Sequence, residues 1–310
     1  MVTALSREAS KLIDQGEFIE ADSRLAEAEA RDLQAAIQQE TFARQRRYSA
    51  AQSRGARGDA AHIRLDHLEA SRHYAEAARI IESEHIFESS FWKRKQAEVL
   101  ASGGDEFGLE HGLEHAIEIY EEQASAMAKF PFEWAAVQHR LGVVLRKLGA
   151  KKADAILLTR AVTAFRGALT IRTSQVAPNE STVTWNSLGV ALDELAEIKN
   201  DPQILNESID AYYQALSGVS REEDPSFWAT ITENMAAAKM RFSDGDFEVK
   251  SLEEGVAAIQ AALTGHLREE APLLWARTQG KLGLALFELA IRDNNVATIE
   301  RAILAYEAAL

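Results

Sequence analysis

The sequence predicts an all-α protein built from repeated pairs of helices. Pro131, Pro178, Pro225 and Pro272 recur every 47 residues. Leucine–glycine and alanine–aromatic–alanine positions recur in the same phase, and no segment alternates polar and apolar residues with the period of two that strands need. Chance does not keep so many columns in phase across four copies. We therefore expect four regular repeats, at 131–177, 178–224, 225–271 and 272–310.

The residue pattern of each repeat predicts two helices. Proline suits the first helical position, because its missing N–H has no partner inside the helix there. Apolar residues follow at helical spacing, a short polar stretch interrupts them, and a second apolar stripe comes after it. We expect helices near 131–149 and 155–174, repeated at steps of 47, with Trp134, Leu141, Phe165 and Ala168 buried.

The order of residues within a repeat resembles the tetratricopeptide repeat. The second copy shows it best, with Trp185 and Leu188-Gly189 in the first helix, then Ser208, Tyr212 and Ala215 in the second. The standard repeat has 34 residues, so a period of 47 resembles a long bacterial type of this family. The resemblance implies a right-handed superhelix of about seven helix pairs. HEAT or armadillo repeats, with periods of about 40–47 residues, are the alternative.

The first 130 residues resemble weaker copies of the same unit, continuous with the regular repeats. A first pair is expected around a turn at 14–17, and Ser49–Gln52 can open a second pair as a capping box. Residues 20–47 contain neither Gly nor Pro, so one long helix can occupy this range. In a third pair, Ala116 lies 45 residues upstream of Ala161, which is the corresponding alanine of the first regular copy.

Composition excludes several classes of protein. The chain has 310 residues, no cysteine and a formal net charge of −14. Without cysteine there are no disulfides, thiolate nucleophiles or thiolate zinc sites. An acidic chain is a poor match for nucleic acid, which needs a basic face. The sequence contains no apolar run of membrane-spanning length and no leader pattern at its start. We expect a soluble cytoplasmic protein.

Two short motifs suggest chemistry, and neither makes a catalytic site. Gly103–Phe107 spells the signature of diguanylate cyclases, but helical patterns flank it where that family has strands. It is interpreted as a turn with capping acids, and a nucleotide-related enzyme stays as the alternative. His111 and His115 share a helical turn, yet two histidines do not close a metal site. We expect no catalytic residue, no metal and no cofactor.

The resemblance implies that a peptide or helix of another protein binds in a groove lined by the first helices. It also implies that the chain is a scaffold, such as the docking arm of a bacterial effector system. Chaperone-tail binders of this family pair a lysine with an asparagine in the first two groove columns, and this sequence has no such pairing. The implied groove columns are His139, Asn186, Glu233 and Gly280, then Val143, Val190, Ala237 and Leu284, then Arg146, Asp193, Met240 and Phe287, then Lys147, Glu194, Arg241 and Glu288, with Arg277 beside them.

One basic patch stands out on this acidic chain. It consists of Arg44, Arg46, Arg47, Arg54 and Arg57. A solvated face of a long helix explains such a run. The functional interpretation is a binding site for an acidic protein surface. A nucleic-acid site is the least favoured of the three interpretations, because few aromatic residues interleave with the arginines.

The end of the sequence generates an expectation about self-association. Leu310 falls in the column of Leu169, Leu216 and Leu263, which a following helix should cover. Ile303 and Tyr306 lie on the same stripe. We expect either that this chain is a fragment of a longer one or that its open end pairs with another molecule, as in a self-associating structural module.

Overall fold

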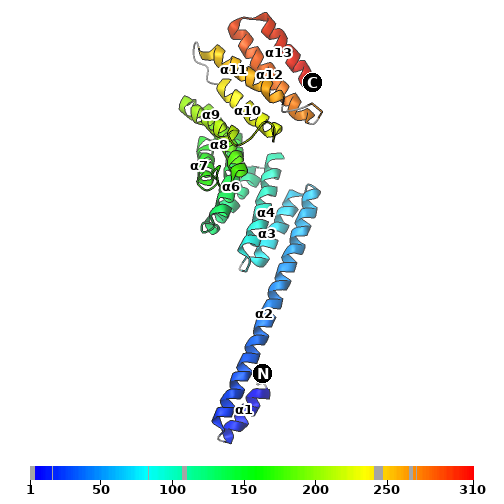
Figure 1. The fold of residues 1–310 in the computed structure, drawn as a ribbon. Coiled ribbons are helices and arrows are strands. Elements are labelled where there is room, and N and C mark those ends of the chain that lie inside the picture. Colours follow the sequence, from blue (N-terminus) through cyan, green and yellow to red (C-terminus); the bar gives the residue numbers. More distant parts are fainter. Residues whose placement is uncertain are drawn as a thin grey trace. The chain divides into compact units, whose positions relative to one another are not determined.

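The computed structural model describes residues 4–15, 17–82, 84–106, 110–240, 247–264, 268–269 and 271–310. Within these ranges all regular structure is helical, and thirteen α-helices pack sequentially in pairs (Figure 1). This confirms the all-α prediction. The chain divides into two compact units, Met1–Val99 and Leu100–Leu310, so the division falls upstream of the first regular repeat.

The helices of the first unit are α1 (Ala4–Asp14), α2 (Phe18–Ile63), α3 (His67–Ile81) and most of α4 (Ile86–Glu106). The second unit contains the end of α4 and the helices α5 (Glu110–Ala126), α6 (Pro131–Lys152), α7 (Ala155–Leu169), α8 (Pro178–Lys199), α9 (Pro202–Leu216), α10 (Pro225–Met240), α11 (Phe247–Leu263), α12 (Pro272–Asp293) and α13 (Val296–Ala309).

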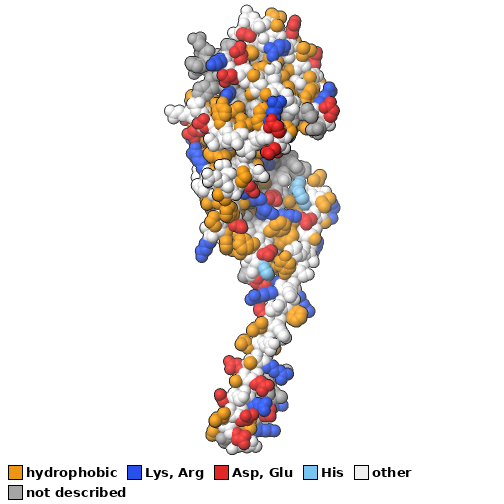
Figure 2. Space-filling view, viewed as in Figure 1, with side chains coloured by type: hydrophobic (Ala, Val, Ile, Leu, Met, Phe, Trp, Pro, Cys, Tyr) orange, Lys and Arg blue, Asp and Glu red, His pale blue; other side chains and the backbone are white. Residues whose placement is uncertain are grey.

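Helix α2 is one continuous helix of 46 residues. Ser49–Gln52 lies inside it, so the expectation that these residues open a new helix is wrong. Between Ala28 and Ala51 none of its residues is buried. Ion pairs one turn apart, such as Arg44 with Glu40 at 3.3 Å, support helix without tertiary packing. Figure 2 shows acidic and basic side chains interspersed along this part of the helix.

The carboxyl-terminal part of α2 packs on α3 and α4 through two glycines. The ring of Tyr74 lies over Gly58, and the indole of Trp92 lies over Gly55. Both rings belong to one buried cluster with alanines of α2 and α3 and with Val99 of α4. The Tyr74 hydroxyl donates a hydrogen bond to Asp59 at 2.8 Å, and Lys95 donates a second at 2.5 Å. The end of α2 and α3 therefore form a helix pair around Gly58 and Tyr74.

The second unit follows the 47-residue period closely. Proline begins α6, α8, α10 and α12. Three of these first helices end at a residue with positive φ, namely Ala153, Asn200 and Asn294, which lie at multiples of the same step. Three of the second helices, α7, α9 and α13, begin after a capping side chain. Asp154, for example, accepts hydrogen bonds from the N–H groups of Ile156 and Leu157. The sequence therefore repeats its helix boundaries as well as its core.

The two helices of each repeat meet at a repeated close contact. In three repeats an aromatic ring of the second helix lies over a glycine of the first helix: Phe165 over Gly142, Tyr212 over Gly189 and Tyr306 over Gly283. In the remaining repeat the glycine is replaced by Ala236 and the aromatic residue by Ile259, both fully buried. The small residue thus becomes larger where its partner becomes smaller.

Most of the expected core is confirmed, with one correction. Leu141, Phe165 and Ala168 are buried. Trp134 is only partly buried, as are the other tryptophans of the regular repeats. Cη2 and Cζ2 of the Trp134 indole lie beside Gly167 of α7, and part of the ring stays in water.

We expect Gly189→Ala to destabilise the second unit by about 1–3 kcal/mol, because the new Cβ would lie 2.6 Å from Cε1 of the Tyr212 ring. Urea unfolding followed by circular dichroism measures the change. Gly280→Ala is the matched control, because nothing lies within 4 Å of a Cβ there. Its higher helix propensity should stabilise the protein by up to about 1 kcal/mol.

A rescue variant separates the contact from a general effect of the substitution. Combining Gly189→Ala with Tyr212→Ile reproduces the pair found at Ala236 and Ile259. The double variant should lose less stability than the sum of the two single variants. Simple additivity would show that the close contact does not set the cost.

Candidate partner-binding face

The first helices α6, α8, α10 and α12 are neighbours joined by polar contacts. Nδ1 of His139 lies 3.1 Å from the hydroxyl of Thr184, which joins α6 to α8. The amide of Asn234 donates a hydrogen bond to the Asn186 side chain at 3.3 Å, which joins α8 to α10. Thr278 donates to Glu233 at 3.3 Å, which joins α10 to α12. Each pair of successive first helices therefore has its own polar link.

Two of the four predicted groove columns are turned toward the next first helix. His139 and Asn186 make the links just described, and Glu233 of the same column is fully buried. In another column, Nη1 of Arg146 lies 2.5 Å from the Glu194 carboxylate, and Asp193 is buried. These side chains hold the helices together. Glu233 and Asp193 are unavailable to a partner, whereas Arg146 and Glu194 each keep about a quarter of their side-chain surface accessible.

Glu233 is a buried carboxylate held by two cations. Nζ of Lys281 lies 2.5 Å from one of its oxygens, and an Nη of Arg277 lies 3.7 Å from the other. All three charged groups lie between α10 and α12. Burying a carboxylate is costly unless its charge and its hydrogen bonds are matched. The position of α12 on α10 therefore depends on these contacts.

The side chains that remain accessible form four parallel columns, which we call the first-helix face. All of them are partly or fully exposed. Their columns are Ala136, Val183, Thr230 and Arg277; Arg140, Ser187, Asn234 and Lys281; Val143, Val190, Ala237 and Leu284; and Lys147, Glu194 and Glu288, whose fourth member, Arg241, lies outside the described residues.

Sequence reasoning missed the column that contains Arg140 and Lys281. It lies one residue after the His139 column and three before the Val143 column. Since residues three apart share a helix face, the accessible Val143 column was the signal that could have found it. The apolar Val143 column lies between two polar columns, so the face has an apolar centre and polar borders.

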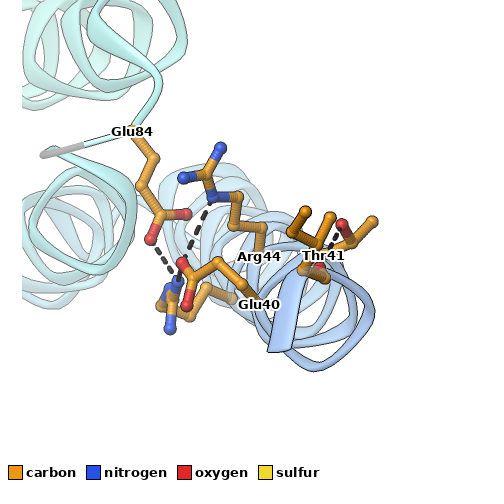
Figure 3. A network of polar contacts seen from close by, with 6 residues as sticks. Glu40, Thr41, Arg44 and Glu84 are labelled. Atoms are coloured by element: carbon orange, nitrogen blue, oxygen red, sulfur yellow. Dashed lines mark hydrogen bonds and ion pairs between the residues drawn. The ribbon is translucent and has the colours of Figure 1, made fainter. Parts of the chain in front are cut away.

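The basic patch of the first unit is partly used within the chain. Arg47 pairs with Glu84 and with Glu40, and Arg44 also pairs with Glu40 (Figure 3). The hydrogen bond with Glu84 contributes most to raising the pKa of Arg47. Arg54 is half-buried, and Arg46 and Arg57 remain exposed. Docking of an acidic partner at this patch remains a prediction.

The other motifs fall on ordinary helical structure. Gly103 to Glu106 form the end of α4, and Phe107 lies outside the described residues. His111 is almost fully exposed, and its Nδ1 lies 3.1 Å from Glu114. Within the described ranges, no group of three His, Asp or Glu side chains is placed to hold a metal ion. In the same ranges, no helix combines the length and apolar character needed to span a membrane.

The end of α13 leaves apolar side chains exposed. Ile303 is half exposed, and Leu310 is fully exposed. Tyr306 covers Gly283 with its ring, and 42% of its surface is still accessible. Self-association through these residues stays a prediction.

No protein-family model matches the chain, and no curated protein matches it in sequence. Among solved structures, the crystal structure of BtubC (BKLC) from P. vanneervenii is similar, with a TM-score of 0.55 and 16% identity over 79% of this chain and 91% of that one. Nearly identical TPR-like repeats from Podosopora anserina align with a TM-score of 0.46 and 17% identity over 69% of this chain and 92% of that one. The likeness to BtubC is one of fold, and it agrees with an array of α-helices packed in sequential pairs.

His139 generates a prediction about pH. Burial lowers its pKa to about 4, and the charges of Arg172 and Arg140 add to the effect. Because the unfolded histidine has the higher pKa, the unfolded state binds more protons as pH falls below about 6.5, and stability is lost. Between pH 8 and pH 5 the stability advantage of wild type over His139→Gln should fall by about 2 kcal/mol.

Urea unfolding at a series of pH values measures this difference. His111→Gln is the matched control, because 92% of that side chain is in water. The substitution replaces an exposed side chain, so it should change the free energy of unfolding by about 0.5 kcal/mol or less. A wild-type advantage over His139→Gln that does not change with pH would contradict the assignment of a buried neutral imidazole.

Lys281→Met should destabilise the protein by about 2–3 kcal/mol, because it leaves the buried Glu233 without its nearest cation. Arg292→Met is the matched control on the same helix. It breaks a 2.5 Å ion pair with Glu288 in which both side chains stay partly accessible. No fully buried charge is left behind, so the substitution should cost about 0.5 kcal/mol or less. Equal losses in thermal or urea unfolding would show that Glu233 does not depend on Lys281.

Proposed function

We propose that this protein is a scaffold that binds an acidic and apolar segment of another protein along the first-helix face, without chemistry of its own. The observation that carries the proposal is the apolar column Val143, Val190, Ala237 and Leu284, which crosses four neighbouring first helices and stays accessible. A segment laid across the helices places successive apolar side chains on this column, and its backbone meets the amide of Asn234 and the hydroxyl of Ser187.

Charge on the first-helix face favours an acidic segment. Its described cations are Arg140, Lys147, Arg277 and Lys281. Its described anions, Glu194 and Glu288, are both paired, with Arg146 and Arg292 respectively. Glu233 beneath the face offsets only part of the positive charge. The face is therefore basic on a chain whose net charge is −14, and this contrast sets the orientation and the association rate of an acidic partner.

A peptide selection tests the proposal. A display library of random peptides is selected against the whole chain, and the affinity of each enriched peptide is measured by fluorescence anisotropy. We expect enriched peptides to combine acidic residues with two or more apolar ones, and to bind more weakly as salt rises. Leu284→Ser, at a half-exposed position, should weaken binding about tenfold, because it removes apolar contact area.

The matched control is Ile156→Ser on α7, where the side chain is 74% exposed and lies outside the first-helix face. It should leave the affinity unchanged. Peptides whose binding is equally insensitive to Leu284→Ser and Val143→Ser would contradict the proposal. A library that yields no peptide above background would contradict it as well.

A further inference from the structure

A pocket separate from the first-helix face opens between the second helices α7 and α9. Its volume is about 530 Å³, and α8 provides its floor. The floor is apolar and includes the partly buried indole of Trp185. The lining residues are Arg166, Leu169, Thr170, Trp185, Leu188, Leu192, Glu207, Asp210, Ala211 and Gln214.

The rim of this pocket carries an unbalanced negative charge. Arg166 of α7 and Glu207 of α9 form an ion pair across the mouth. Asp210, also on α9, is exposed, and it makes no hydrogen bond or ion pair with the described part of the chain. The pocket thus combines the indole of Trp185 in its floor with one available carboxylate, that of Asp210.

Elsewhere in the same unit, an arginine of the chain covers the indole of two of the other three tryptophans, Trp228 and Trp275. The guanidinium carbon of Arg221 lies 5.3 Å from the ring centre of Trp228, and that of Arg268 lies 5.1 Å from the ring centre of Trp275. In both repeats the arginine precedes the tryptophan by seven residues, and the two pairs are 47 residues apart. A guanidinium over an indole is therefore a repeated feature of this chain.

The second repeat lacks this internal cover. Ser174 occupies the arginine column and Ser181 the tryptophan column, and the indole comes one helical turn later, at Trp185. No cation of the described residues lies over the Trp185 ring. Where two repeats hold a guanidinium against an indole, the second repeat has an open pocket with a carboxylate on its rim.

We propose that this pocket binds the arginine side chain of a protein partner, with the guanidinium between the face of Trp185 and the carboxylate of Asp210. A guanidinium is planar and stacks on an indole, and it forms charge-assisted hydrogen bonds with a carboxylate. The apolar floor contacts the methylene groups of the same side chain. This basic ligand differs in charge from the acidic segment proposed for the first-helix face, so the two sites are tested independently.

The experiment titrates N-acetyl-arginine N-methylamide into the ¹⁵N-labelled whole chain. The readout is the indole N–H resonance of Trp185, assigned by its absence in Trp185→Phe. We expect a saturable shift of this resonance with a dissociation constant in the millimolar range, typical of a single exposed side-chain contact. The citrulline analogue keeps the shape of arginine without its charge, and it should produce no saturable shift.

Asp210→Asn should weaken binding of the arginine probe about fivefold, because it removes the charge that the guanidinium faces. Glu300→Gln on α13 is the matched control, an exposed acid far along the sequence from the pocket. It should leave the titration unchanged. Both variants replace exposed side chains, so their circular dichroism spectra should match that of wild type.

Three outcomes would overturn the proposal. The first is the absence of a saturable shift at Trp185 with the arginine probe. The second is equal binding of the arginine and citrulline probes, which would identify an apolar pocket without charge selectivity. The third is equal affinity for the corresponding lysine amide, which would show that the site does not select a guanidinium.

Discussion

The structure of each repeat depends on how closely its two helices approach. A ring can lie flat on the backbone of the first helix only where that helix has no Cβ, which explains the glycines under Phe165, Tyr212 and Tyr306. The exchange to Ala236 and Ile259 keeps the combined volume of the contact nearly constant. This contact fixes the distance between the helices. That distance in turn decides which side chains of the first helix point to its partner, to the next repeat or to solvent.

The same contact also occurs in the first unit with a shorter connection. Gly58 and Tyr74 are 16 residues apart, whereas Gly142 and Phe165, like Gly189 and Tyr212, are 23 apart. The seven additional residues lengthen the helices around the turn and leave the contact unchanged. Helix pairs of different length in this chain are therefore built around one packing solution.

Periodicity predicted the fold and most of the core, because burial repeats along a helix and the helix boundaries repeat with the prolines. It did not predict that α2 continues through Ser49–Gln52, because a capping box is a local preference that a continuous helix overrides. The candidate face was only partly predictable. Columns were assigned by family resemblance, whereas the rotation of each first helix decides that His139 faces α8 and Arg140 faces solvent. The pocket at Trp185 depends on side-chain positions of three helices, and no sequence spacing encodes it.

The polar links between first helices have a consequence for how such an array can change over generations. Repeats of equal length are prone to unequal recombination, which deletes, duplicates or reorders them. Here each junction has a different chemistry: imidazole with hydroxyl at α6–α8, amide with amide at α8–α10, and carboxylate with two cations at α10–α12. Joining the helix that carries Glu233 to one that offers Ile231 in place of Thr278 and Asn234 in place of Lys281 would bury an unmatched charge. The junctions therefore favour one order of the repeats, because an array joined in another order would leave buried polar groups without their partners.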